Sequence, residues 1–142
     1  MTAAEYLGRA RTLDIEIGAK QRELMGIKMN AQSLHSPLLG DKVLSTLKIE
    51  ANNAIDKAVD LDNQIKEELA ELISIKAELH ARVNNLTNKR YVTVLTDYYI
   101  NCMTLEEVSE AENYSTSQVK RLRRSAVKEF AEFYGFVKDE PE

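Results

Sequence analysis

The sequence has few of the residues on which several protein classes depend. It has no tryptophan, two prolines and five glycines among 142 residues, whereas an all-β protein would need turn residues at short, regular intervals. Its single cysteine, Cys102, cannot form an internal disulfide, and a lone cysteine is usually a small buried residue of a protein in a reducing cytoplasm. These absences predict an all-α chain.

Long apolar stretches are also absent. No run approaches the ~20 apolar residues that a membrane-spanning helix requires, and no basic and apolar signal segment begins the sequence. With 44% apolar and 30% charged residues, the composition is typical of a soluble, foldable chain. We therefore expect a cytoplasmic protein with no membrane partner.

Motifs for catalysis and metal binding are missing as well. There is no glycine-rich phosphate loop, no CxxC, no HExxH and no GxSxG. His35 and His80 stand far apart without ligand-like neighbours. Adjacent carboxylates such as Glu106 and Glu107 fit exposed helix charges better than an acid–base pair in a pocket. We expect no catalytic residue, no metal ligand and no cofactor, and the chain is not predicted to be an enzyme.

Two long segments of the N-terminal half repeat apolar residues every seven positions. These repeats predict long helices with narrow apolar seams, which pair either as an antiparallel hairpin within one chain or between chains. Charged residues such as Lys66 and Glu68 are expected on the solvent side of the second helix. The seam positions are Tyr6, Leu13, Lys20, Ile27 and Leu34 with Ala10, Ile17, Leu24 and Ala31, and Ala51, Ala58, Ile65, Leu72, Leu79 and Leu86 with Ile55, Leu61, Leu69, Ile75 and Val83.

Turn-forming residues divide the chain. Pro37 and Gly40 predict that the first helix ends near His35, and Asp41 is suited to begin the second. The asparagine-rich segment at 84–88 predicts the next boundary. The expected parts are a helical hairpin over residues 1–86 with a loop near 35–41, a small helical module over residues 87–136, and an acidic tail over residues 137–142.

Residues 104–130 have the pattern of a helix-turn-helix. Thr104 with Glu107, and Ser115 with Gln118, have the spacing of two capping boxes, each of which begins a helix. Apolar residues at three- and four-residue steps let the two helices pack on each other and on a preceding helix over 89–101. The expected core residues are Tyr91, Val94, Leu95, Tyr98, Tyr99, Leu105, Val108, Val119, Leu122, Ala126, Phe130 and Phe133, and Gly135 is expected to end the last helix.

The second helix of this pair leaves a basic face on a protein whose formal net charge is −4. Residues 120–128 hold five basic residues and no acidic one. A solvated helix face would explain the same residues, but lysine and arginine that replace counterions along phosphates supply most DNA affinity. The face predicted to read double-stranded DNA consists of Thr116, Ser117, Gln118, Lys120, Arg121, Arg124 and Lys128.

Four stretches carry a resemblance over nearly the whole chain. They are YLGRARTLDIEIGAKQREL, SPLLGDKV, AVDLDNQIKEELAELISIKAEL and RYVTVLTDYYINCMTLEEVSEAENYSTSQVKRLRRSAVKEF. Together they resemble the ArpU and RinA late transcription regulators of phages and prophages of Gram-positive bacteria, and the last stretch is similar to the promoter-reading helix-turn-helix of primary sigma factors. The resemblance implies a DNA-binding regulator of late genes in the bacterial cytoplasm, with host RNA polymerase as a further partner.

The resemblance also implies roles for individual residues. Ser115 would cap the recognition helix, and Arg124 and Lys128 would lie nearer phosphate. The residues facing the major groove would be Thr116, Ser117, Gln118, Lys120 and Arg121. Two positions depart from the family pattern, since Leu105 is usually tryptophan there and the position of Arg123 is often histidine. These departures put the transfer of a DNA sequence preference in doubt.

The N-terminal half bears on the alternatives. Its only aromatic residue is Tyr6, so it lacks the residues with which a complete sigma factor captures unpaired bases. We expect it to form a homodimer or to bind a partner, and a dimer would place two recognition helices on half-sites about one helical turn apart. Two alternatives are an oligomeric DNA-packaging adaptor resembling a small terminase subunit, and a protein-binding inhibitor acting through the hairpin.

Overall fold

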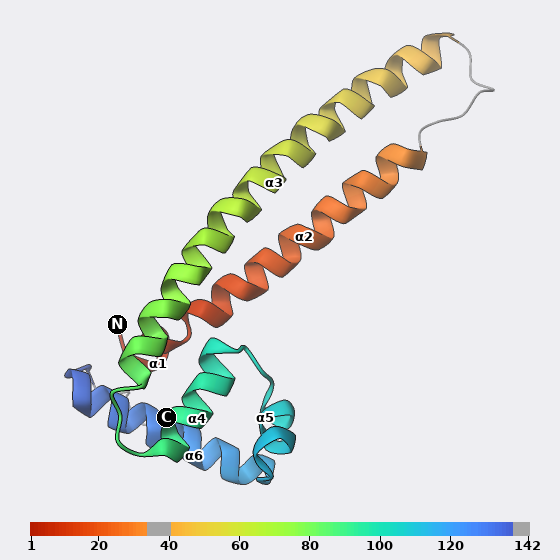
Figure 1. Ribbon diagram of the computed structural model, residues 1–142. Coiled ribbons are helices and arrows are strands. Elements are labelled where there is room, and N and C mark those ends of the chain that lie inside the picture. The colour runs from red at the N-terminus through yellow and green to blue at the C-terminus, as the bar shows by residue number, and fades with distance from the viewer. Residues whose placement is uncertain (34–40, 138–142) are drawn as a thin grey trace. The chain divides into compact units, whose positions relative to one another are not determined.

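The computed structural model describes residues 1–33 and 41–137, and every regular element in that part of the chain is a helix (Figure 1). The all-α prediction is therefore confirmed. The predicted loop after residue 33 and the tail after Val137 lie outside the described residues. The elements are α1 (Ala3–Leu7), α2 (Arg9–Ser33), α3 (Asp41–Val83), α4 (Lys89–Leu95), the π-helical turn η1 (Thr96–Ile100), α5 (Leu105–Glu112) and α6 (Thr116–Tyr134).

The chain divides into two compact units. The first, here called the head, contains residues 1–14 and the chain from residue 72 onward, and the second, here called the arm, contains residues 15–71. This division differs from the boundary expected near residue 86. The reason is that the beginning and the middle of the chain supply buried residues to the head, namely Ala3, Tyr6, Leu7, Ala10, Leu13, Leu72, Leu79, Val83 and Leu86.

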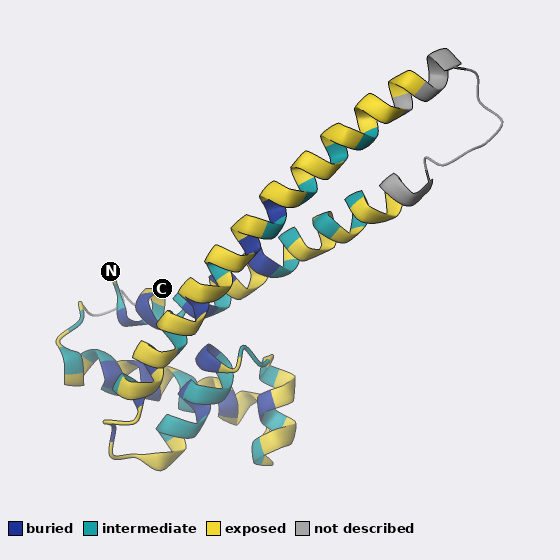
Figure 2. Cartoon of the chain, turned by 45° about the horizontal axis from the view of Figure 1, so that its top comes forward, coloured by how far each residue is buried: buried dark blue, intermediate teal, exposed yellow. Residues whose placement is uncertain are grey.

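In the arm, α2 and α3 run side by side in opposite directions (Figure 1). Buried and half-buried residues of each helix face the other (Figure 2), with Ile17, Leu61 and Ile65 the most completely covered. The long helices thus pair within one chain. Lys20, the polar residue in the first seam, forms an ion pair with Glu68, so the expectation that Glu68 faces solvent was wrong: it neutralises a charge that the seam would otherwise leave unpaired.

The N-terminal helix is interrupted where the heptad pattern predicted continuity. Gly8 separates α1 from α2, and its ψ of −5° departs from helical geometry. A glycine in a helix interior is destabilising by about 1 kcal/mol relative to alanine, so this is a natural position for a break. The interruption leaves α1 as a separate short helix. The Thr2 hydroxyl caps its start, and α1 contacts α6.

An aromatic cluster lies at the centre of the head. Phe130 of α6 is fully buried, and its ring centroid is 6.0 Å from that of Tyr6, 4.7 Å from Tyr134 and 5.8 Å from Phe136. Phe133, which periodicity assigned to the core, is instead exposed. Because α6 contacts α1 as well as its two expected neighbours, α4 and α5, its buried face is wider than predicted and includes Val127.

The expected supporting helix is present as α4 followed by η1. Val94, Leu95 and Tyr99 are buried as predicted, whereas Tyr91 and Tyr98 are half-buried. At the other end of the module, Gly135 has a φ of +70° and caps α6. This left-handed conformation carries little strain only for glycine, so the expected end of the last helix is confirmed.

Candidate nucleic-acid interface

Two capping boxes fix where the helices of the expected helix-turn-helix begin. Before α5, the Thr104 hydroxyl accepts from the Glu107 amide at 3.1 Å, and the Glu107 carboxylate accepts from the Thr104 amide at 3.2 Å. Before α6, the Ser115 hydroxyl accepts from the Gln118 amide at 3.2 Å, and the Gln118 side-chain oxygen accepts from the Ser115 amide at 2.9 Å. Both predicted boxes are confirmed.

The connection between α5 and α6 is a tight turn. Asn113 caps α5 with a φ of +58°, a left-handed conformation that asparagine tolerates better than most residues. The Tyr114 amide donates to the Ser109 carbonyl at 3.1 Å, and the Ser109 hydroxyl donates back to the Tyr114 carbonyl. These bonds close the turn, so the start of α6 is held at a defined angle to α5.

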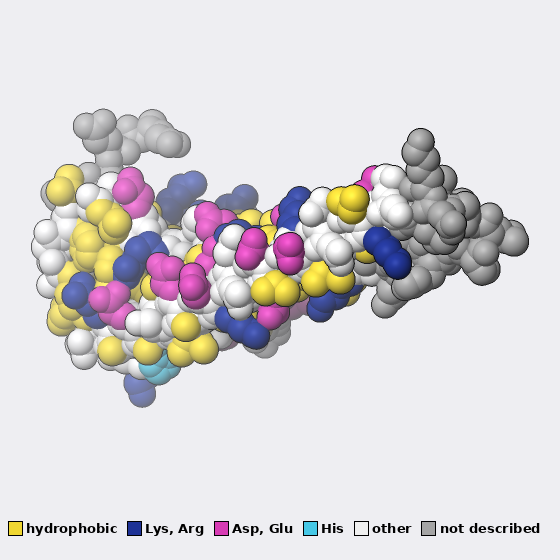
Figure 3. Space-filling view, turned by 90° about the horizontal axis from the view of Figure 1, so that it is seen from above, with side chains coloured by type: hydrophobic (Ala, Val, Ile, Leu, Met, Phe, Trp, Pro, Cys, Tyr) yellow, Lys and Arg dark blue, Asp and Glu magenta, His cyan; other side chains and the backbone are white. Residues whose placement is uncertain are grey.

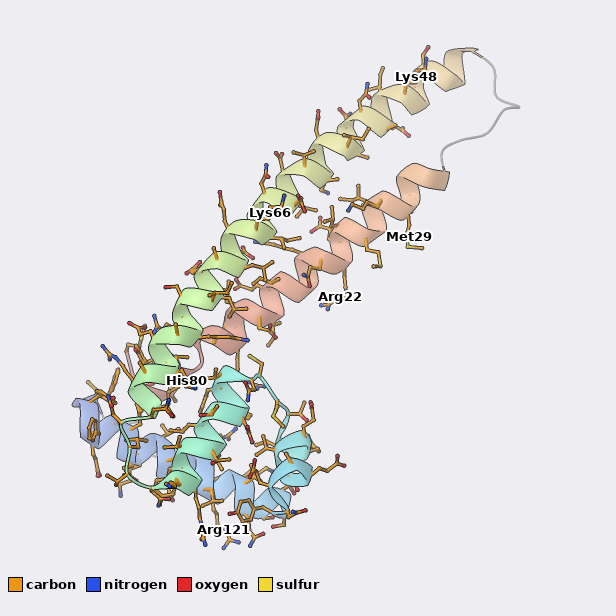
Figure 4. The ribbon with its side chains drawn as sticks, viewed as in Figure 1. Arg22, Met29, Lys48, Lys66, His80 and Arg121 are labelled. Carbon is orange, nitrogen blue, oxygen red and sulfur yellow. The ribbon has the colours of Figure 1, made fainter. Side chains whose placement is uncertain are left out.

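The predicted DNA-reading residues lie together on α6. All seven, Thr116, Ser117, Gln118, Lys120, Arg121, Arg124 and Lys128, are exposed. At 1.5 Å per residue, the distance from Ser117 to Lys128 along the axis is about 16 Å. Figure 4 shows Arg121 projecting from α6 away from the other helices of the head. Gln118 differs from the rest because its side-chain oxygen is engaged in the capping box, which leaves the NH₂ group as its unengaged polar group.

Arg123 does not belong to this face. It is half-buried, and its guanidinium carbon lies 4.6 Å from the ring centroid of Tyr98. Arg11, at the beginning of α2, lies 4.0 Å from the same ring centroid. Both cations are therefore placed for cation–π contact with one tyrosine, and Arg123 acts in packing.

Arg11 also holds the segment that leads into α5. One of its terminal nitrogens donates to the Tyr98 carbonyl at 2.7 Å and to the Met103 carbonyl at 2.9 Å. Between these carbonyls, Cys102 has a φ of +55°, a conformation that needs such support. Sequence reasoning missed Arg11 as a positioning residue because nothing local indicates that residue 11 contacts residues 98 and 103.

Cys102 itself has no features of a reactive thiol. Burial raises the pKa of its thiol, and the nearby Asp14 carboxylate raises it further. A higher pKa means less thiolate, the form that acts as nucleophile and metal ligand. In the described part of the chain, no three His, Cys, Asp or Glu side chains are grouped closely enough to hold a metal ion.

Two carboxyl groups meet where η1 approaches the end of α5. A hydrogen bond shared with Asp97 raises the pKa of Glu112, and partial burial and the negative charge of Asp97 add to the effect. One oxygen of Asp97 is buried and has no hydrogen-bond partner. The pair therefore destabilises the folded head at neutral pH and is relieved when Glu112 binds a proton.

We expect Glu112→Gln to stabilise the protein by about 0.5–1 kcal/mol at pH 7, because the amide can donate a hydrogen bond to Asp97 without a charge. The folded-state pKa of Glu112 exceeds its ordinary value of 4.5, so wild-type stability should fall as the pH rises through that folded-state value. Thermal unfolding at pH 4 and pH 7 measures this. The advantage of the variant should shrink at pH 4, and an equal advantage for Glu110→Gln, at an exposed position of the same helix, would contradict the assignment.

Known protein families, curated proteins and solved structures provide a comparison for this chain. A family model described as a protein of unknown function, DUF1492, matches residues 35–131. The chain belongs to the DUF1492 family. The match includes α5 and every basic residue of the exposed face of α6, whereas α1 and Arg11 of this DUF1492 chain precede it. No curated protein and no solved structure matches the chain.

Two further observations describe the surroundings of the face in this DUF1492 protein. Lys89 and Arg90, at the start of α4, are exposed basic residues of the head, while α5 carries the exposed acids Glu106, Glu107 and Glu110. α5 therefore contains acids and no basic residue, whereas basic residues lie on α4 and on the exposed face of α6. No helix in the described part of the chain is long and apolar enough to cross a membrane.

Proposed function

We propose that this protein binds double-stranded DNA sequence-specifically and that α6 is its recognition helix. The observation that carries the proposal is the exposed face of α6, which presents Lys120, Arg121, Arg124 and Lys128 with no acid between them. The two capping boxes support it because they fix where α5 and α6 begin, and the hydrogen bonds of the turn hold the start of α6 against α5. A helix presented in this way fits the major groove, which admits one α-helix.

Residues along α6 have different proposed roles. The first turns of a recognition helix reach deepest into the groove, so Arg121 is assigned to base edges, where a bidentate contact with guanine gives about 1–3 kcal/mol of discrimination. Thr116, Ser117 and Lys120 lie beside it. Arg124 and Lys128, further along the helix, are assigned to phosphates, which supply affinity without sequence information. Gln118 is assigned a contact through its NH₂ group, because its oxygen caps the helix.

We expect Arg121→Ala to reduce sequence preference and Lys128→Ala to reduce affinity for all DNA. Arg121→Ala should reduce the preference for the specific site over random DNA by roughly 5- to 150-fold, whereas Lys128→Ala should weaken binding to both and lower the salt slope by about one. Fluorescence anisotropy at several salt concentrations measures both effects. Arg22→Ala removes an equal charge from an exposed position of α2 (Figure 4) and is the matched control. Equal losses on both DNAs for Arg121→Ala and Lys128→Ala would contradict the division.

The specific site can be found by selecting bound fragments from a random DNA pool at near-physiological salt. A sequence enriched by the wild type and by Arg22→Ala, but not by Gln118→Ala/Arg121→Ala, would support a sequence-specific regulator. A folded protein that enriches nothing would overturn the proposal and favour DNA packaging or protein binding. Circular dichroism of each variant separates lost contacts from lost folding, which matters for Gln118 because of its capping role.

The biological setting that we propose is late gene expression of a phage or prophage in the bacterial cytoplasm, with host RNA polymerase as a second partner. The support is the resemblance of the chain to late transcription regulators and of residues 87–136 to the promoter-reading module of sigma factors. Transcription in vitro by bacterial RNA polymerase from a template carrying the selected site tests this setting. A change in transcript level with the wild type and none with Arg121→Ala is the expected result.

A further inference from the structure

A second row of residues runs along α3, separate from those that pack against α2. The row, here called the outer stripe, consists of Ile55, Val59, Asp62, Lys66, Leu69 and Ile73, at alternating steps of four and three residues. The four apolar members are 55%, 52%, 38% and 70% exposed, in chain order. At 100° per residue, the stripe lies roughly 100° around the helix from the seam that faces α2, so α2 does not cover it. Hydrophobic side chains are visible among charged ones along the arm in Figure 3.

The outer stripe has the residue spacing of a coiled-coil seam. Its spacing is that of heptad positions, and it has the narrow width that one further helix would cover. In a solvated helix face, these positions would be polar, as they are at the neighbouring exposed residues Asp60, Gln64 and Glu67. Four large apolar side chains held in water at regular spacing therefore indicate an unfilled contact.

The order of residues in the stripe specifies the partner. Consider a second copy of α3 that packs antiparallel to the first, with the two-fold axis at the level of residue 64. Each residue of one copy then faces a residue of the other copy, and the two residue numbers sum to 128. Ile55 then faces Ile73 of the partner subunit, Val59 faces Leu69 of the partner subunit, and Asp62 faces Lys66 of the partner subunit. Every apolar residue meets an apolar one, and each charge meets its opposite.

The charges also exclude a parallel pair of α3 helices in register. In a parallel pair in register, Asp62 would face Asp62 of the partner subunit and Lys66 would face Lys66 of the partner subunit, and like charges across an interface are repulsive. Asp62 and Lys66 already form an ion pair within α3 at 2.9 Å. In the antiparallel pair, the four charges alternate in sign around the axis, whereas in the parallel pair they repel across it.

We propose that the outer stripe is a homodimer interface in which two copies of α3 pack antiparallel. The surface is self-complementary, as a two-fold interface requires. It is distinct from the seam between α2 and α3, so each arm keeps its own hairpin and the dimer is a bundle of two hairpins. The proposal does not rest on DNA binding, because it uses no residue of α6.

Sedimentation velocity of the full chain tests the interface. The wild type is expected at twice the mass of the 16.1 kDa chain. Asp62→Lys should weaken the dimer at least about tenfold, because it places lysine opposite Lys66 of the partner subunit, and Asp62→Lys/Lys66→Asp should restore it. A wild-type monomer at tens of micromolar, or a double variant as weak as the single one, would overturn the proposal.

A second comparison addresses the apolar part of the stripe. Val59→Lys should convert the protein to monomer, while Gln64→Lys, which adds the same charge at an exposed position on the opposite side of α3, should leave the dimer intact. Circular dichroism confirms that both variants are folded. Equal dimerisation of the two variants would exclude the outer stripe as the interface.

Cross-linking tests the orientation. In a Cys102→Ser background, Val59→Cys and Leu69→Cys proteins should form a disulfide-linked dimer when mixed under mild oxidation, but neither should do so alone. Dimers of Val59→Cys with itself would indicate the parallel arrangement and overturn the antiparallel one. DNA binding is measured separately on the same variants, so failure of the dimer and failure of the recognition helix give different results.

Discussion

A fragment beginning at residue 87 is expected to be unfolded. This is where the sequence places the start of the helix-turn-helix module, but the core of the head requires α1, the first turns of α2 and the end of α3. Tyr6 and Leu7 are buried in the head, and α1 contacts α6. Fully burying one large apolar side chain contributes about 1.5–3 kcal/mol. The fragment loses seven of them, so the loss is comparable with the whole stability of a typical domain, about 5–15 kcal/mol. They are Tyr6, Leu7, Leu13, Leu72, Leu79, Val83 and Leu86.

The matched control keeps the head and removes the arm. Residues 1–14, joined to the chain from residue 72 onward by a Gly/Ser linker of about six residues, should fold, because Arg9 pairs with Glu78 at 2.5 Å and the helices on which they lie run side by side in the head. Thermal unfolding followed by circular dichroism compares the two fragments. A cooperative transition in the fragment that begins at residue 87 would show that the head does not depend on the N-terminal residues.

Arg11→Ala is expected to reduce the free energy of unfolding by about 2–3 kcal/mol. The substitution removes the donor for two backbone carbonyls and one cation from the Tyr98 ring, and hydrogen bonds to a charged group contribute about 1.5–3 kcal/mol each when buried, less at this half-buried site. Arg11→Lys should recover little, because an ammonium cannot stack on the ring and bridge both carbonyls.

Urea unfolding of the full chain measures the loss. Arg22→Ala removes the same side chain from an exposed position of α2 and should change the free energy of unfolding by less than about 0.5 kcal/mol. If Arg11→Ala is as mild as this control, the guanidinium does not hold the segment before α5. A second readout is DNA binding by folded Arg11→Ala at low temperature, which should weaken if the angle of α5 depends on that segment.

Features that depend on neighbouring residues could be predicted from the sequence. The two capping boxes need only a hydroxyl and, three residues later, a side chain that accepts a hydrogen bond, and both are present at the predicted positions. The end of α6 at Gly135 and the exposure of the basic face likewise follow from residues within one or two turns of each other. The local geometry of the candidate site could therefore be predicted from the sequence.

Features that depend on distant residues could not be predicted in the same way. The assignment of Phe133 to the core assumed two neighbouring helices, whereas α6 also contacts α1, and its buried face includes Val127 in place of Phe133. Glu68 was placed in solvent because nothing near it in the sequence indicates that it meets Lys20. The role of Arg11 depends on carbonyls about ninety residues away, and no periodicity encodes that contact.

The contact between Tyr6 and Phe130 has a consequence for synthesis of the protein. The two hairpin helices of the arm can pair as soon as residues 15–71 have left the ribosome, but the contact of α1 with α6 cannot form until α6 emerges. Loop closure over such a separation is slow compared with local helix formation. We therefore expect the head to form after translation, with Tyr6 and Leu7 exposed to chaperones and proteases until the end of the chain arrives.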